Sequence, residues 1–283
     1  MSESGHNSAL LEVEDLKVQF KLKRESLLSA QPILHAVDGV SFIIDRGKTL
    51  GLVGESGCGK STSGLALLGL VTPSHGKLLF DGIDLSSLKA EQMFPIRKRM
   101  QIIFQDPYSS LNPRMLVKDI IKEPLDINTN LTLSEKNEKV DWLLNKVGLT
   151  LEQSNRYPHE FSGGQRQRIG IARALATDPE IIIADEPVSA LDVSIQAEII
   201  NLMMDLQEEL NLSIIFIAHD LSVVKHISSR VGVMYSGELV EIKDTGDIFD
   251  RPEHDYTKEL LRAIPKPDPF GREERKKNRL SIV

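Results

Sequence analysis

The sequence is short of cysteine and of long apolar runs. Cys58 is the single cysteine in 283 residues, which leaves no internal disulfide and no cysteine cluster and is typical of a reducing compartment. No apolar run approaches the roughly 20 residues that a membrane span needs, and the first residues lack the basic and apolar parts of a signal peptide. We therefore expect a cytoplasmic protein that depends on a partner for any role at a membrane.

Positive charge is also scarce. The sequence carries 34 Lys and Arg against 41 Asp and Glu, a formal net charge of −7, which argues against a surface built to neutralise a phosphate backbone. We expect no nucleic-acid partner. With 41% hydrophobic and 27% charged residues, the chain can bury a sizeable core and should form one large domain or a domain with a subdomain.

A glycine-rich stretch with the pattern G-x-x-x-x-G-K-S runs from Gly54 to Ser61, between an apolar strand pattern at 49–53 and an apolar helical run at 65–68. Glycines let successive backbone N–H groups converge on one point, and the helix N-terminus adds its positive dipole end there. Lys60 then reaches the phosphates of a nucleoside triphosphate, and Ser61 ligates the Mg²⁺ that bridges them. A chance glycine-rich turn is the alternative, which the strand-to-helix context disfavours. The nucleotide-contacting residues predicted here are Gly54, Glu55, Ser56, Gly57, Cys58, Gly59, Lys60, Ser61 and Thr62.

Residues 10–20 alternate apolar and polar side chains, and residues 37–44 and 77–80 do the same. This alternation predicts half-buried strands, the first of them at a sheet edge, which form a small antiparallel sheet beside the nucleotide. Phe20 either stacks on a purine ring or packs at the rim of this sheet. The sequence leaves both possibilities open.

Polar residues follow three further predicted strands, at the carboxyl ends where open α/β sheets bind ligands. Gln105 follows residues 99–104, where it is either a strand cap or a site residue. The apolar strand at 181–184 leads to two adjacent carboxylates, and buried charges need a partner. Asp185 is placed to hold Mg²⁺, and Glu186 to polarise the water that attacks the γ-phosphorus. His219 follows residues 213–218, where a lone histidine is usually only hydrogen-bonded.

Residues 116–157 indicate a small helical subdomain inserted into the sheet domain, with a capping-box spacing at Thr132 and a stop at Gly148. Ser162 caps another helix, and the two glycines after it let an anion approach the backbone closely. That helix start is therefore a second phosphate-binding end or a plain cap. Asp192 precedes an amphipathic helix that ends near Asn211.

In this order, the motifs at 54–61, Gln105, 161–165, 181–186, 189–192 and His219 resemble those of the ATP-binding subunit of an ABC transporter. The resemblance implies an α/β fold: a P-loop NTPase (RecA-like) core with a mostly parallel sheet, an N-terminal antiparallel β subdomain and an inserted α-helical subdomain. It implies an ABC ATPase domain at 10–265, with the core and β subdomain at 10–105 and 166–245, the helical subdomain with the signature sequence at 106–165, and a C-terminal extension at 246–283.

The same resemblance implies residue roles. ATP lies between the phosphate-binding loop of one subunit and the signature sequence of another in a head-to-tail dimer. Gln105 touches Mg²⁺ and senses the membrane partner, His219 contacts the γ-phosphate, and Asp192 communicates across the dimer. The implied catalytic residues are Glu186, His219 and Gln105; the implied metal-binding residues are Ser61, Gln105 and Asp185; and those acting on the partner's ATP are Ser162, Gly163, Gly164 and Gln165.

A closer resemblance, to the F-type ATPase subunit of oligopeptide and dipeptide importers, rests on residues 105–114, 157–160, 234–241 and 252–258. It implies ATP hydrolysis coupled to peptide import at the cytoplasmic face of the membrane. The implied partners are a second ATPase in a heterodimer or homodimer, two transmembrane permease subunits and, indirectly, an extracytoplasmic solute-binding protein. Some relatives bind an iron–sulfur cluster through tail cysteines that this chain lacks, so we expect no cluster. An importer ATPase for nickel or another solute, or a soluble ABC ATPase, is the alternative.

Overall fold

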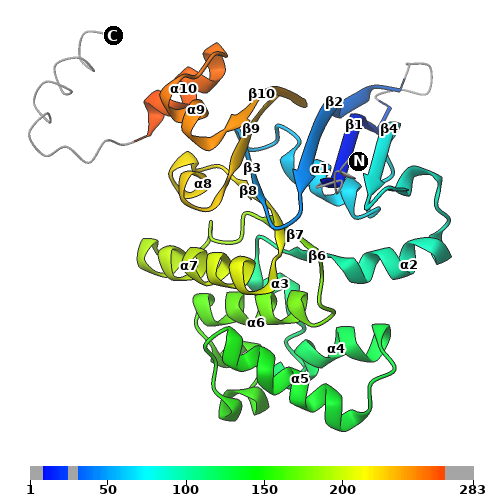
Figure 1. Ribbon diagram of the computed structural model, residues 1–283, viewed down its shortest axis with the longest axis vertical. Helices are drawn as coiled ribbons and strands as arrows, with labels where there is room; N and C mark the ends of the chain where they lie inside the picture. The colour runs from blue at the N-terminus through cyan, green and yellow to red at the C-terminus, as the bar shows by residue number, and fades with distance from the viewer. Residues whose placement is uncertain (1–8, 25–30, 265–283) are drawn as a thin grey trace, which may run out of the picture.

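Two β-sheets, a helical subdomain and a C-terminal helical segment make up the protein (Figure 1). This computed structural model describes residues 9–24 and 31–264. A four-stranded antiparallel sheet has the order β2-β1-β4-β5. A six-stranded sheet has the order β10-β9-β3-β8-β7-β6, in which all neighbours run parallel except β9 and β10.

The strands are β1 Ala9–Lys21, β2 Ile33–Asp45, β3 Thr49–Val53, β4 His75–Phe80, β5 Ile83–Asp84, β6 Met100–Ile103, β7 Ile181–Asp185, β8 Ser213–Ala218, β9 Arg230–Tyr235 and β10 Glu238–Asp244. The helices are α1 Lys60–Leu67, α2 Ala90–Arg99, α3 Pro107–Ser110, α4 Val117–Asn128, α5 Leu133–Lys146, α6 Gly163–Leu175, α7 Val193–Leu210, α8 Leu221–Ile227, α9 Thr245–Asp250 and α10 Asp255–Ala263. Short 3₁₀ turns lie at Leu85–Ser87, Leu151–Asn155 and Pro158–Glu160.

Both faces of the six-stranded sheet are covered, which explains the unbroken apolar runs of its strands. In β7, Ile181 and Ile183 pack into the core shared with α1 and the antiparallel sheet. Ile182 and Ala184 pack into the core shared with α6 and α7. A strand buried on both faces needs no polar side, so its sequence is continuously apolar. The predicted α/β fold, with a mostly parallel sheet and an antiparallel β subdomain, is confirmed.

Helix α1 lies between the two sheets, and its packing holds the loop that precedes it. Leu67 shares one buried cluster with Val40 of the antiparallel sheet and Ile217 of the parallel sheet. Gly64 approaches β7 so closely that an added Cβ would lie 3.0 Å from the Ile183 side chain. The N-terminus of α1 therefore has a fixed position relative to the carboxyl ends of the parallel strands.

The prediction that the first strand lies at a sheet edge was wrong. β1 pairs with β2 on one side and with β4 on the other, so it is an inner strand. Alternation of apolar and polar residues indicates that one face of the strand is buried. Inner strands and edge strands both have such a face. The number of neighbours depends on pairing with distant segments, which the alternation does not encode. Asp15, with φ of 47°, lies where the β1 register shifts against both neighbours.

The chain between β6 and β7 forms the expected helical subdomain, below the sheets in Figure 1. Helix α5 begins with the predicted capping box. The Thr132 N–H donates to the Glu135 carboxylate at 2.7 Å, and the Glu135 N–H donates to the Thr132 hydroxyl at 3.4 Å. The helix ends at Lys146, and Gly148 follows with φ of 72°. This agrees with the predicted stop, because glycine adopts a positive φ without a Cβ clash.

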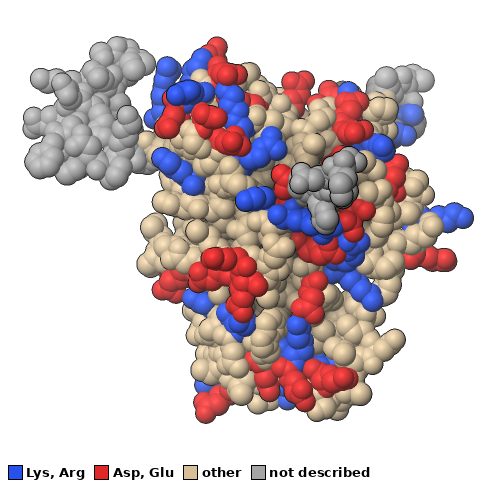
Figure 2. All heavy atoms as spheres, viewed as in Figure 1, with Lys and Arg blue, Asp and Glu red and all other residues tan. Residues whose placement is uncertain are grey.

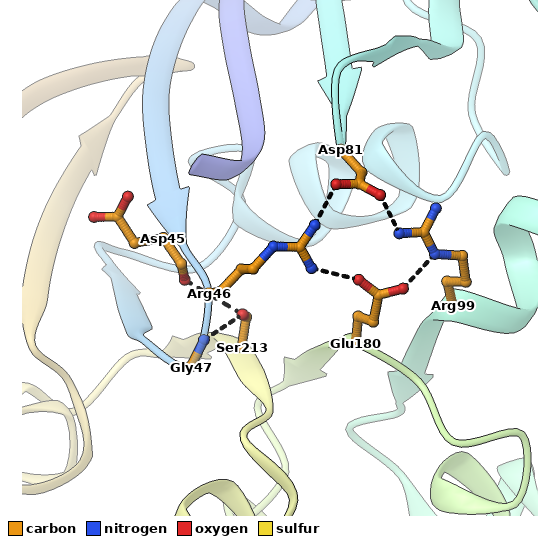
Figure 3. Close-up of polar contacts among 7 residues, drawn as sticks. All are labelled: Asp45, Arg46, Gly47, Asp81, Arg99, Glu180 and Ser213. Atoms are coloured by element: carbon orange, nitrogen blue, oxygen red, sulfur yellow. Dashed lines mark hydrogen bonds and ion pairs between the residues drawn. The ribbon is translucent and has the colours of Figure 1, made fainter. Parts of the chain in front are cut away.

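A closed ring of ion pairs joins the two sheets at the amino ends of the parallel strands (Figure 3). Arg46, in the turn after β2, and Arg99, at the end of α2, each contact both Asp81 and Glu180. Hydrogen bonds from Arg99, reinforced by Arg46, lower the pKa of both carboxyl groups. Because Asp81 lies between β4 and β5 and Glu180 precedes β7, the ring ties the antiparallel sheet to the parallel one.

Within residues 9–24 and 31–264, no helix combines the length and the apolar character needed to cross a bilayer. The face drawn in Figure 2 shows both signs of charge interspersed, with acidic side chains gathered where α7 crosses it. Helix α7 has no lysine or arginine, and its acidic residues are Glu198, Asp205, Glu208 and Glu209. The surface excess of negative charge is therefore concentrated in part on this helix.

Candidate functional site

The glycine-rich loop links β3 to α1, as predicted. Gly59 is the N-cap residue of α1 with φ of 106°, and a Cβ there would lie 2.2 Å from the Ala36 carbonyl oxygen, so only glycine fits. Lys60 is 4% exposed, and its Nζ donates to the carbonyl oxygens of Gly54 and Glu55 at 2.8 Å each. The ammonium group therefore points into the loop, where a polyphosphate would meet it.

The remaining loop residues differ in exposure. Glu55, Ser56 and Gly57 are exposed, and Thr62 is half-buried in the first turn of α1. Cys58 belongs to the buried cluster of α1 and the antiparallel sheet, and its Sγ lies 3.7 Å from Lys60 Nζ. Its thiol is turned toward the core, so its backbone is the part available to a phosphate.

Ser61 and Asp185 form a pair of oxygen ligands at the start of α1 and the end of β7. The Ser61 hydroxyl donates to Asp185 Oδ1 at 2.7 Å. Burial raises the pKa of Asp185 and the charge of Glu186 adds to the rise, whereas Ser61 and Lys60 oppose it. A cation at this position would favour the charged carboxylate. Hydroxyl and carboxylate oxygens are ligands that Mg²⁺ accepts, so these residues fit a magnesium site.

Three side chains that the sequence placed at separate strand ends meet beside this pair. Gln105 Nε2 donates to Glu186 Oε2 at 2.9 Å, and His219 Nδ1 lies 3.4 Å from the same oxygen. They come together because β6, β7 and β8 are neighbours in one parallel sheet, so their carboxyl ends lie along one edge. A carboxylate that is held by a hydrogen bond from Gln105 and lies beside His219 is suited to orient a water molecule and take its proton.

The backbone at Glu186 has a feature that no sequence pattern revealed. Glu186 has φ of 44°, in the left-handed region that non-glycine residues rarely adopt. Its N–H donates to the Ile217 carbonyl oxygen at 3.0 Å, and the Ser189 hydroxyl donates to its carbonyl oxygen at 3.0 Å. These bonds hold the strained conformation, which is typical of functional sites. They also link Glu186 to β8 and to the segment that leads into α7.

The predicted cap at the start of α6 is confirmed. The Gln165 N–H donates to Ser162 Oγ at 3.4 Å, and the Ser162 N–H donates to Gln165 Oε1 at 3.1 Å. The two glycines pack against the start of α7: an added Cβ on Gly164 would lie 2.5 Å from Ile195, and one on Gly163 would lie 3.2 Å from Leu191. A Cβ on Gly164 would therefore force Ile195 to shift, whereas a Cβ on Gly163 would make only a tight contact with Leu191.

The signature segment and the phosphate-binding loop occupy different places in the subunit. Within the described part of the chain, no hydrogen bond or ion pair joins residues 162–165 to residues 54–62. Asp192 is exposed at the N-cap position of α7, and its side chain makes no capping hydrogen bond. These residues therefore do not complete the site around Glu186 within the same chain.

Phe20 lies on the strand next to the one that approaches the loop. It lies on β1 opposite Leu34 and is 39% exposed. Ala36 on β2 is the residue that touches Gly59, and the exposed His35 precedes it. Nothing in the sequence singled out His35, because its placement depends on the pairing of β1 with β2.

A tyrosine from the C-terminal segment also reaches the loop. The Tyr256 hydroxyl accepts a hydrogen bond from the Glu55 N–H at 3.0 Å. The Tyr256 ring lies 4.4 Å from the Tyr235 ring, measured between centroids. Sequence patterns did not predict this contact, because 201 positions separate Glu55 from Tyr256. The site thus includes a part of the chain that follows the sheet domain.

Two family models match the chain. One, described as ABC transporter, matches residues 37–189. The other, described as the C-terminal region of oligopeptide/dipeptide transporters, matches residues 240–282. Together they span the loop, Gln105, Asp185, Glu186 and the segment that carries Tyr256, whereas His219 lies between the two matched ranges.

Similar curated proteins have the names of peptide transport ATPases. The oligopeptide transport ATP-binding protein OppF of Bacillus subtilis (strain 168) is 56% identical, over 92% of this chain and 84% of the relative. The oligopeptide transport ATP-binding protein AppF of the same organism is 53% identical, over 93% of this chain and 80% of the relative. The dipeptide transport ATP-binding protein DppF of Haemophilus influenzae is 51% identical, over 97% of this chain and 84% of the relative.

Solved structures with the same fold are ABC cassettes. A dimeric post-hydrolysis state of the ATP-binding cassette MJ0796, bound to ADP and Pi, has a TM-score of 0.74 at 27% identity, covering 83% of this chain and 98% of that one. CbiO1 from Clostridium perfringens, part of the ABC transporter complex cbiONQ, has a TM-score of 0.75 at 27% identity, covering 92% of this chain and 97% of that one.

Proposed function

The chain belongs to the ABC transporter ATP-binding proteins, and from this membership we propose that it binds and hydrolyses ATP to drive the import of oligopeptides or dipeptides. One observation carries the proposal. Residues suited to phosphate binding and to hydrolysis meet at one edge of the parallel sheet, in a chain whose C-terminal region matches that of oligopeptide/dipeptide transporters.

The triphosphate of ATP binds at the loop 54–62. Lys60 exchanges its hydrogen bonds to the Gly54 and Glu55 carbonyl oxygens for phosphate oxygens, and backbone N–H groups at the start of α1 complete the cradle. Ser61, Asp185 and Gln105 would hold Mg²⁺, which would neutralise charge on the phosphates. Phe20 and His35 lie on the two strands that border the loop, and we assign them to the base end of the nucleotide.

Glu186 acts as the general base. Its carboxylate orients the attacking water and takes the proton, while Gln105 and His219 fix its position by contacts to Oε2. His219 also contacts the γ-phosphate. Two hydrogen bonds keep Glu186 in place as the nucleotide is exchanged: its N–H donates to the Ile217 carbonyl oxygen, and the Ser189 hydroxyl donates to the Glu186 carbonyl oxygen.

A second ATPase subunit completes the site. Ser162, Gly163, Gly164 and Gln165 contact the ATP bound by the partner, because the helix N-terminus that they form is separate from the loop of their own chain. Asp192 communicates across the same interface. The dimeric form of the similar cassette MJ0796 supports a head-to-tail dimer, as a heterodimer or a homodimer.

Two transmembrane permeases and a solute-binding protein complete the importer, so that the chain works at the cytoplasmic face of the membrane.

The chain divides into a core with β subdomain at 10–105 and 166–245, a helical subdomain at 106–165 and an extension at 246–283. The segment after Gln105 leads from the site into the helical subdomain, and Tyr108 on it is 65% exposed. This segment transmits the state of the site to a permease.

The proposal is tested by reconstituting the chain with its permeases and partner ATPase in proteoliposomes. We expect ATP-dependent uptake of a labelled peptide, and we expect Gln105→Ala to keep ATP binding but to uncouple ATP turnover from uptake. Uptake of nickel in place of peptides would support an importer for another solute. A chain that associates with no permease and is dispensable for all such uptake would identify a soluble ABC ATPase.

A further inference from the structure

The phosphate-binding loop is contacted by a side chain from the C-terminal segment, which its own motif does not explain. The hydroxyl of Tyr256, in α10, accepts the Glu55 N–H at 3.0 Å. Tyr256 is 8% exposed. A buried phenol hydroxyl needs a hydrogen-bond partner, so this bond fixes the hydroxyl and the loop relative to each other.

The start of α10 is itself firmly anchored. The Glu241 carboxylate on β10 accepts the N–H of Glu253 at 2.9 Å and the N–H of His254 at 3.0 Å. Lys243 Nζ lies 3.2 Å from the same carboxylate, whose side chain is 5% exposed. A buried carboxylate with several donors is a strong tie, because breaking it leaves an uncompensated charge. Tyr256 therefore stands on a fixed base two residues after His254.

The Glu55 residue is bonded at both its backbone groups. Tyr256 receives its N–H, and Lys60 Nζ donates to its carbonyl oxygen at 2.8 Å. Phosphate binding takes the Lys60 ammonium group away from this oxygen. The bond to Tyr256 then still joins the start of the loop to α10, alongside the bond from the Gly237 N–H to the Cys58 carbonyl oxygen at 3.1 Å farther along the loop.

We propose that Tyr256 is a positioning residue that holds the start of the phosphate-binding loop in its nucleotide-accepting conformation, which gives the C-terminal segment a direct part in ATP binding. This inference rests on the proposed ATP-binding function. Tyr256 touches the loop and no reacting atom. Ground state and transition state both contain the bound triphosphate, so loss of the tie weakens both equally. Such uniform weakening raises KM and leaves kcat unchanged.

The chain offers a matched control. Tyr256→Phe removes the hydroxyl and keeps the ring that packs on Tyr235. Tyr235→Phe removes a hydroxyl from the other ring of the same pair. Tyr235 is 45% exposed. The two variants make the same chemical change on the same pair of rings, and only one of them removes the bond to Glu55.

The experiment measures ATP binding to the purified full chain and steady-state ATPase kinetics in the reconstituted complex. For Tyr256→Phe we expect the Kd and KM for ATP to rise about fivefold, the effect of one neutral hydrogen bond, with kcat unchanged. Tyr235→Phe should leave both constants as in the wild type. Hydrogen exchange should quicken at the Glu55 amide in Tyr256→Phe alone, a local change that a space-filling role of Tyr256 would not produce.

The inference is overturned if Tyr256→Phe binds ATP as the wild type does, or if kcat falls while KM stays constant. It is also overturned if Tyr235→Phe has the same effect as Tyr256→Phe. A wild-type chain that binds no ATP would refute the proposed function itself. Normal ATP binding by both the wild type and Tyr256→Phe is a different result. It would refute only the role of Tyr256.

Discussion

Replacing Glu241 with glutamine removes a buried charge that anchors the start of α10. The carboxylate accepts two backbone N–H groups, from Glu253 and His254, and lies beside Lys243. Glutamine keeps one acceptor oxygen but places an NH₂ donor where the second was, opposite another donor. We expect the free energy of local unfolding of α10 to fall by about 3–4 kcal/mol at neutral pH.

This magnitude follows from the pKa of Glu241. Burial acts to raise the pKa, but the Thr257 hydroxyl, the two backbone N–H groups and Lys243 outweigh it and lower the pKa from 4.5 to about 2. A difference of about 2.5 units, at about 1.4 kcal/mol per unit, gives the figure of about 3–4 kcal/mol. Because the folded pKa lies below the unfolded one, the stabilisation is fully present above pH 4.5 and is lost as the pH falls toward 2.

The assay is hydrogen exchange of the α10 amides, compared between the wild type and Glu241→Gln at pH 7 and at pH 3.5. At the lower pH, about one unit below the ordinary pKa of the carboxyl group, the difference between the two proteins should shrink by about 1.4 kcal/mol. Glu238→Gln, an exposed position on the same strand, is the control and should change little. The reasoning would be refuted if the free energy of local unfolding fell by the same amount at both pH values, or by the same amount in Glu238→Gln.

Three further predictions concern the site and the ring of ion pairs. Glu186→Gln should bind ATP normally but hydrolyse it about 10²–10⁴-fold more slowly, because an amide cannot act as a base; near-normal turnover in the reconstituted complex would remove Glu186 from that role. Gly164→Ala should lower the free energy of unfolding by about 1–3 kcal/mol in urea titrations, because its Cβ meets Ile195; unchanged stability would contradict this packing. A double-mutant cycle of Arg99→Ala and Glu180→Ala should give a coupling of about 0.5–1 kcal/mol, since both side chains are partly exposed, and zero coupling would mean that their contact contributes nothing.

Several features were predictable because they depend on residues that are close in the chain. The bounds of β3 and β8 matched the apolar runs, since a strand buried on both faces has a continuous apolar sequence. The caps at Thr132 and Ser162 matched as well, because a capping box needs only a cap residue and a partner three positions later. The neighbouring positions of Gln105, Glu186 and His219 followed from the rule that parallel strands share a carboxyl edge.

Contacts between distant segments could not be predicted in this way. β1 is an inner strand, and Ala36 of β2 approaches Gly59, because the pairing of whole strands sets both placements. Tyr256 reaches Glu55 across 201 positions only because β9 pairs with β3 and β10 with β9, which brings the C-terminal segment back to the loop. The positive φ of Glu186 is likewise maintained by bonds from other elements. Local propensity acts over a few residues, whereas these placements depend on which buried faces pack together, and that is settled only when the whole core forms.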